Sequence, residues 1–157
     1  MAVASFTALT PQTVQVATQN VSTGATTIGS FTIPSLALST ALSSIRFQAW
    51  GVIANNANTK TLTLSRGSIF IQVNLIAGAA VPWVVDFFLT AQDPGGNFTI
   101  ANQPYSGKVI CGNTSASTSQ PIGGVSALDF TASNTFLFTA TGGATGDITC
   151  YGCVLLT

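Results

Sequence analysis

Short runs of β-branched and aromatic residues, broken by turn formers, constrain the fold of this chain more than any other feature of its sequence. Thr, Val, Ile and Phe recur in these runs, and clusters of Gly, Asn, Pro and Ser separate them. Such runs are typical of β-strands, and no stretch shows the apolar period of an amphipathic helix. The pattern predicts strands that end near Ala17 and Ile33 and strands that begin at Ser44, Lys60, Ser68, Pro82, Asn97, Gly107, Ala127, Thr135 and Asp147.

This many strands in a chain of 157 residues predict two packed antiparallel sheets. We therefore expect an all-β fold, a single-domain antiparallel β-sandwich over residues 13–157, preceded by an extended N-terminal arm of residues 1–12. Turn-forming residues at 54–59 and 92–97 fit connections between strands. The Ser- and Thr-rich segment 111–124 predicts a longer polar loop.

Charged residues are scarce, because four Lys and Arg balance four Asp and the chain has no His and no Glu. They make up 5 % of the chain, whereas ordinary domains carry about 25 %. So little charge gives weak repulsion between copies, which favours a subunit of an assembly. Nucleic-acid binding needs a basic surface that neutralises phosphates, and four balanced basic residues do not supply one.

The sequence offers few groups for catalysis or metal binding. Without His or Glu most acid–base designs are excluded, and the acidic residues show no metal-binding spacing: Asp86, Asp93, Asp129 and Asp147. A Ser–Lys dyad that uses Lys60 or Lys108 stays open, but no motif surrounds either lysine. We predict no enzyme activity, no cofactor and no metal site.

The three cysteines, Cys111, Cys150 and Cys153, are an odd number and cannot form a complete disulfide framework. Cys150 and Cys153 stand three positions apart in an alternating pattern, which predicts that they point to opposite faces of one strand. Three thiols without a His lack a fourth good zinc ligand. We expect free cysteines that are buried as small hydrophobic residues.

The longest apolar stretch, residues 75–89, is interrupted by Pro82 and Asp86 and is too short to span a bilayer. No Lys or Arg precedes Arg46, and the start has no continuous apolar segment, so we do not expect a secretory signal. The sequence therefore predicts synthesis in a cytoplasm and no membrane partner.

The stretch 46–67 holds three of the four basic residues. Alternation predicts that one side of its first strand is core and that the other is mixed, with Arg46, Gln48, Trp50 and Val52 outward. An Asn-rich turn leads to a second strand, so Arg46 and Lys60 should lie near the ends of two paired strands. A basic residue on a mixed face is usually solvated or ion-paired, but it can instead meet an Asp of a neighbouring subunit. We take Arg46 and Lys60 as candidate inter-subunit polar contacts.

Four segments resemble, in their order, tailed-bacteriophage structural proteins with a tumour-necrosis-factor-like jelly roll: FTIPSLAL, IRFQAWGVIANNANTKTLTLSRGS, VPWVVDFFLTA and ITCYGCVLL. In those proteins an arginine strand leads into an Asn-x-Asn-x-Lys-x-Leu hairpin, here residues 56–62. The resemblance covers roughly residues 31–156 and is most specific over 46–67. It implies a jelly-roll topology and trimeric knobs on a virion, either capsid decoration (cement) proteins or the heads of fibres. The sequence shows no long N-terminal rod of the kind a fibre needs, which favours decoration.

The expected function is therefore that of a homotrimer on the outer surface of a phage head, where it binds the major capsid protein and stabilises the shell. Phe6 and Leu9 of the arm are the candidate capsid contacts. The alternative is a receptor- or carbohydrate-binding tip of a phage fibre, in which exposed aromatic residues stack on sugars: Trp50, Trp83, Tyr105 or Tyr151. Core packing is the favoured interpretation for both Trp residues.

Overall fold

The computed structural model describes residues 12–15, 19–21, 23–34, 44–66, 69–75, 80–90, 101–112, 117–127 and 132–156. Every regular element in these ranges is a β-strand. The strands are β1 (Gln12–Gln15), β2 (Gln19–Asn20), β3 (Gly24–Ile33), β4 (Ser44–Ile53), β5 (Thr61–Arg66), β6 (Ile69–Asn74), β7 (Pro82–Thr90), β8 (Ala101–Gly112), β9 (Ser117–Ala127), β10 (Asn134–Gly142) and β11 (Ile148–Leu156).

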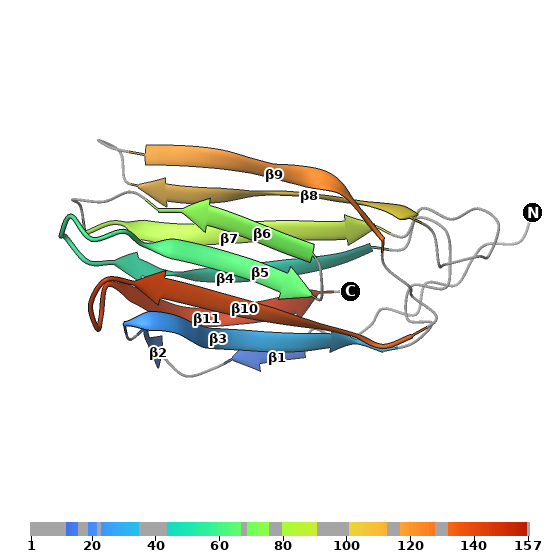
Figure 1. Cartoon of the computed structure of the whole chain (residues 1–157), viewed down its shortest axis with the longest axis horizontal. Helices are drawn as coiled ribbons and strands as arrows, with labels where there is room; N and C mark the ends of the chain where they lie inside the picture. Colours follow the sequence, from blue (N-terminus) through green and yellow to red (C-terminus); the bar gives the residue numbers. More distant parts are fainter. Residues whose placement is uncertain are drawn as a thin grey trace, which may run out of the picture.

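These strands form two sheets that lie face to face (Figure 1). The seven-stranded sheet has the order β1-β11-β4-β7-β8-β9, and β2 also pairs with β11. The four-stranded sheet has the order β3-β10-β5-β6. Neighbouring strands in both sheets are antiparallel.

The chain alternates between the two sheets along the path of a jelly roll. It passes from β3 in the four-stranded sheet to β4 in the larger one, returns for the hairpin β5–β6, and crosses again to β7. The last two strands repeat the alternation, with β10 in the smaller sheet and β11 in the larger. The hairpin β8–β9 extends one edge of the larger sheet (Figure 1). The predicted antiparallel β-sandwich with jelly-roll topology is confirmed.

Stacked aromatic rings join the two sheets in the core. Phe31 of β3 stacks on Phe47 of β4 and on Phe136 of β10, with ring centroids 5.0 Å apart in both pairs. Phe47 also meets the edge of Phe138 at 5.1 Å. Each such pair adds about 0.5–1.5 kcal/mol to the stabilisation that burial alone supplies. Because Phe47 belongs to the larger sheet and its partners to the smaller one, these pairs hold the sandwich closed.

Trp83 of β7 is fully buried in this core, as the sequence predicts, with its ring 6.3 Å from that of Phe138. Its indole lies against Gly51 of β4. A Cβ atom at Gly51 would stand 2.8 Å from Trp83 Cζ2 and would clash directly with the carbonyl oxygen of Thr149. This position therefore requires glycine, because a methyl group would displace both the indole and the neighbouring strand.

A β-bulge in β11 corrects the prediction for Cys150 and Cys153. The pairing of β11 with β4 shifts between Cys150 and Gly152, so Tyr151 is an extra residue in the strand. Such a bulge reverses the alternation of side chains beyond it. Cys150 and Cys153 consequently both face the core and are both fully buried, whereas the sequence predicts opposite faces. They are free thiols, as is the buried Cys111.

The edge of the larger sheet corrects two further predictions. A single strand, β8, runs through Ala101–Gly112, where the sequence predicts separate strands from Asn97 and from Gly107. The predicted polar loop over 111–124 is wrong in its larger part, because Ser117–Ala127 is β9. Hydrogen bonds to β8 satisfy the backbone of β9, so its Ser and Thr content does not prevent strand formation. The arm lies outside the described residues except for Gln12, which is the first residue of β1.

Candidate interaction surface and buried polar network

Exposed apolar side chains gather on the outward face of the seven-stranded sheet. In the described ranges six large hydrophobic side chains are exposed, and five of them belong to this sheet, with exposed fractions between 36 % and 49 %: Trp50, Val84, Phe88, Ile110 and Tyr151. We call these five residues the outer apolar face. The sixth, Leu137, belongs to β10 of the other sheet.

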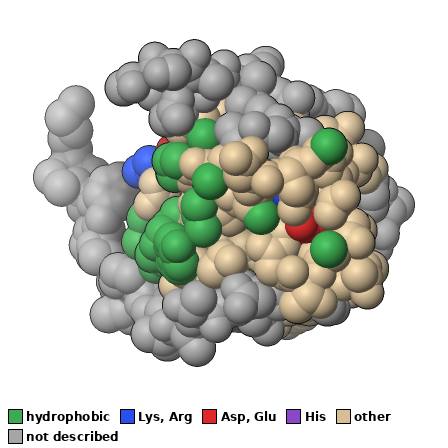
Figure 2. Space-filling view, turned by 90° about the vertical axis from the view of Figure 1, so that its left-hand side faces the viewer, with side chains coloured by type: hydrophobic (Ala, Val, Ile, Leu, Met, Phe, Trp, Pro, Cys, Tyr) green, Lys and Arg blue, Asp and Glu red, His purple; other side chains and the backbone are tan. Residues whose placement is uncertain are grey.

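Strand register makes part of this face continuous, while the polar row of Gln48, Asp86 and Lys108 separates Phe88 from the rest. Trp50 of β4 pairs with Val84 of β7, and Val84 pairs with Ile110 of β8, so the three side chains form a row across three strands. The turns 54–60 and 143–147 lie at one end of the sandwich (Figure 1). Seen from that end, hydrophobic side chains gather toward one side of the molecule (Figure 2).

Glycine and the bulge in β11 shape the aromatic part of the outer apolar face. Trp50 lies over Gly152, where an added Cβ atom would come within 2.8 Å of Trp50 Cζ2. The bulge turns Tyr151 outward beside it. The core packing predicted for Trp50 is therefore wrong, although the sequence does place this residue on the outward side of its strand. The side chain of Tyr105 lies outside the described part of the structure.

Arg46 lies on the same side of the sheet and pairs with an acid of its own chain. Its Nε donates to Asp86 Oδ1 at 2.7 Å and its Nη2 donates to Asp86 Oδ2 at 2.8 Å. The hydrogen bond with Asp86 raises the pKa of Arg46 above its ordinary value. The guanidinium also stands 5.1 Å from the centre of the Phe88 ring. The two charges neutralise each other at this position, and a contact of Arg46 with another subunit stays a prediction.

Lys60 is fully buried, which corrects the prediction that it contacts a neighbouring subunit. Its Nζ donates to the main-chain oxygens of Asn56 and Asn58, each at 3.1 Å, and to Asn56 Oδ1 at 2.7 Å. These acceptors belong to the turn that precedes β5. The ammonium group is therefore enclosed by its own chain and does not reach the surface.

Asp147 completes this polar cluster from the turn between β10 and β11. Its carboxylate accepts hydrogen bonds from Asn56 Nδ2 at 2.6 Å, Asn58 Nδ2 at 2.9 Å and the backbone N–H of Ala144 at 2.8 Å. The bond from Asn56 is the main reason that the pKa of Asp147 is lowered from its ordinary value, although burial acts in the opposite direction. We call Asn56, Asn58, Lys60 and Asp147 the end network. The role of Asp147 does not follow from its sequence position, although the alternating polar residues of Asn-x-Asn-x-Lys are a signal for a polar cluster at this turn.

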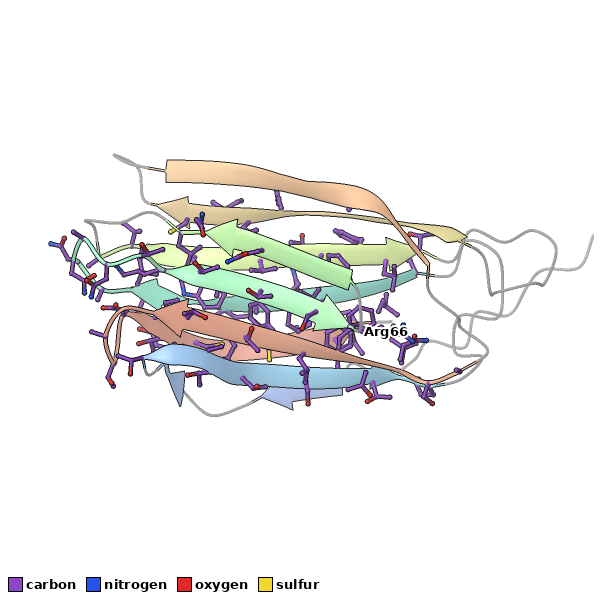
Figure 3. All side chains as sticks on the ribbon, in the orientation of Figure 1. Arg66 is labelled. Carbon is purple, nitrogen blue, oxygen red and sulfur yellow. The ribbon has the colours of Figure 1, made fainter. Side chains whose placement is uncertain are left out.

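Of the two remaining basic residues, Arg66 lies apart from these two features, whereas Lys108 lies on the outward side of the larger sheet, two positions from Ile110. Figure 3 shows Arg66 at the end of β5, away from the turn that holds the end network. Lys108 is exposed on β8, where it pairs in register with Asp86. Phe6 and Leu9 lie outside the described residues. Within the described ranges, no three His, Cys, Asp or Glu side chains come together as a metal site, and no helix is long and apolar enough to cross a membrane.

Comparison with known proteins finds a similarity to a solved phage structure. No protein family model and no curated protein matches the sequence. The chain is similar to the CBM2 module of the evolved Dit of Lactobacillus casei BL23 phage J-1, with a TM-score of 0.35 and 10 % sequence identity. The match covers 80 % of this chain and 66 % of that chain, slightly less than two thirds. Similarity at this level indicates neither a function nor a partner, because unrelated functions share β-sandwich folds.

Proposed function

We propose that this protein is a structural subunit of a bacteriophage virion, a capsid decoration (cement) protein. In this role it binds the major capsid protein on the outer surface of the head as a homotrimer and stabilises the shell. The observation that carries the proposal is the outer apolar face, five exposed large hydrophobic side chains on one sheet. Several large apolar side chains exposed on one sheet are typical of proteins that bind other protein surfaces.

The charge distribution supports an assembly built on apolar contacts. Asp86 neutralises Arg46 beside the outer apolar face, and the end network encloses both Lys60 and Asp147. Copies of the chain therefore meet with little repulsion and without an unpaired charge of Arg46 to desolvate. The resemblance of residues 31–156 to trimeric phage knobs supports the same assembly.

The first experiment tests the assembly. Val84→Thr/Ile110→Thr replaces two residues of the outer apolar face by β-branched polar residues that preserve strand propensity. The matched control is Leu137→Thr, on the outward side of the other sheet. Sedimentation equilibrium should give a trimer for the wild type and the control and smaller species for the double variant. A monomeric wild type at micromolar concentration would contradict the trimer.

The second experiment tests decoration. Heads that lack the protein are heated, with and without purified protein added back, and genome release or shell collapse is followed. Added protein should raise the temperature at which heads fail, because a ligand of the assembled shell stabilises it by mass action. Heads that fail at the same temperature with and without bound protein would overturn the decoration role.

A second candidate function, the carbohydrate-binding tip of a phage fibre, is favoured by a specific pair of residues. Trp50 and Tyr151 expose aromatic rings on neighbouring strands, a surface on which sugar rings can stack. Binding of host cell-wall polysaccharide that is lost in Trp50→Ala, together with heads that gain no stability from the protein, would favour this role over decoration.

A further inference from the structure

Three oxygen atoms surround the buried ammonium group of Lys60. Two are main-chain carbonyl oxygens, of Asn56 and Asn58, and the third is the side-chain oxygen of Asn56, at distances of 2.7–3.1 Å. An ammonium group has three N–H donors and no acceptor, so the three oxygens match its hydrogen-bonding capacity. A neutral amine would instead direct a lone pair at one of these oxygens. The geometry thus fits a charged lysine inside the protein.

The side-chain amide of Asn56 connects the ammonium group of Lys60 to the carboxylate of Asp147. Asn56 accepts from Lys60 through Oδ1 and donates through Nδ2 to Asp147 Oδ1 at 2.6 Å. Lys60 and Asp147 form no direct ion pair. Among the described residues, the pair of opposite charges within 4.0 Å is Arg46 and Asp86. Asn56 therefore bridges Lys60 and Asp147, whose opposite charges make the buried cluster neutral as a whole. Neutrality matters because an isolated buried charge costs many kcal/mol.

The turn itself has the form of a cation-binding loop. The main-chain oxygens of Asn56 and Asn58 and the side-chain oxygen of Asn56 converge on one centre, and Asn56 Oδ1 also accepts the backbone N–H of Asn58 at 3.1 Å. Main-chain and amide oxygens are the groups that proteins use to bind hard cations. Calcium needs oxygen distances of about 2.3–2.6 Å, whereas the distances here are longer and suit a larger monovalent ion.

We propose that residues 56–60 form a monovalent-cation site that the side chain of Lys60 permanently occupies. The tethered ammonium group organises the turn before β5 and, through Asn56 and Asn58, joins it to the turn before β11. This end of the sandwich consequently keeps its shape without any bound metal. Removal of the side chain leaves a vacant site for a free cation of similar size, such as ammonium or potassium. This proposal is independent of decoration.

The test is chemical rescue of Lys60→Ala. Thermal unfolding of the wild type and of the variant is measured in ammonium chloride and in tetramethylammonium chloride at equal concentration. Ammonium fits the vacated cage, and the tetramethylated ion is too large and has no N–H donor. In the wild type, the midpoint of thermal unfolding should differ between the two salts only by their non-specific effects. In Lys60→Ala, ammonium should raise the midpoint further.

At an ammonium concentration about ten times the dissociation constant of the site, the unfolding midpoint of the variant should rise by roughly 3–5 °C beyond the wild-type difference. Lys60→Met, which refills the space with an apolar chain, is the matched control and should show no ammonium-specific gain. Where Lys60→Ala does not fold in tetramethylammonium chloride, the yield of folded protein after refolding in each salt replaces the melting curve. The proposal is overturned if the difference between the two salts, in midpoint or in yield, is no larger for Lys60→Ala than for the wild type.

Discussion

Asp147 keeps its negative charge inside the protein through hydrogen bonds from neutral donors and not through contact with a cation. Two of the donors are side-chain amides of the opposite turn, and the third is the backbone of its own turn. Such bonds favour the ionised form. They also join two segments that stand about ninety positions apart in the sequence, so this one side chain contributes to the shape of the whole end of the sandwich.

Asp147→Asn should remove part of the acid sensitivity of the protein. Because the folded-state pKa is lowered, the unfolded chain takes up the proton first as the pH falls. The stabilisation is complete above the ordinary value of 3.8 and is lost as the pH falls through the folded-state pKa. Asp147→Asn should be less stable than the wild type at pH 7, and its free energy of unfolding should decline less between about pH 5 and about pH 2.

Urea unfolding at a series of pH values measures this difference. Lys108→Gln changes the net charge by one unit in the opposite direction at an exposed position and should retain the pH dependence of the wild type. A decline of equal slope in Asp147→Asn and the wild type would mean that folding does not lower the pKa of Asp147.

The three buried thiols should be unreactive in the folded protein. Burial raises the pKa of Cys150, and burial together with the neighbouring Cys150 raises the pKa of Cys153 to about 12. The thiolate is the reactive form, so a disulfide reagent at pH 8 should modify these cysteines only after unfolding. Absorbance of the released thiol anion, with and without guanidinium, gives the count. Rapid modification of Cys150 or Cys153 without denaturant, located by peptide mass spectrometry, would show that β11 opens in the native state.

At the scale of the elements, the sequence predicted strands better than it predicted how they pair. The strands β3, β4, β5, β7, β10 and β11 were expected because their apolar residues alternate and turn residues separate them. The sequence does not predict the bulge at Tyr151, because an inserted residue leaves the composition of the strand unchanged. Whether a bulge forms depends on the partner strand. For the same reason the sequence predicts a polar loop over most of β9, because its strand conformation depends on pairing with β8.

The candidate site was predicted in a similar, partial way. Alternation correctly set Arg46 and Trp50 outward, but the ion pair with Asp86 depends on which strand lies beside β4. Burial of Lys60 was missed because a lysine at a turn is ordinarily solvated, and the oxygens that enclose it come mainly from the backbone. Sequence patterns report which residues share a face, whereas such enclosure follows only from the folded turn.

Hydrogen exchange should rank the strands by their place in the sheets. β4 and β7 pair with neighbours on both sides, whereas β6 and β9 each pair with one strand in the described structure. We expect the slowest amide exchange in β4 and β7 and the fastest in β6 and β9, because edge strands open at lower free energy. Mass spectrometry of peptides from exchanged protein gives the ranking. Protection of β9 equal to that of β4 would mean that another molecule covers this edge.

At the scale of the whole molecule, the shortage of charge sets how an assembly responds to salt. With Arg46 paired inside its own chain and Lys60 enclosed, few charges remain to form ion pairs between subunits. Salt weakens exposed charge pairs but not apolar contacts. The dissociation constant of the trimer should therefore change by less than about threefold between 0.05 M and 1 M sodium chloride. Light scattering or sedimentation at both concentrations measures it, and dissociation at high salt would indicate ionic contacts.

The pairing of distant strands has a consequence for how the molecule is made. β1 pairs with β11, joining Gln12 to Leu155, and β3 pairs with β10 along its whole length. Neither β1 nor β3 can form these pairings until residues 134–156 have left the ribosome. The hydrophobic strands of the nascent chain therefore stay unpaired until then. Contacts between such remote positions also slow folding. These strands are thus exposed to aggregation during synthesis as well as during assembly. At that stage they depend on molecular chaperones.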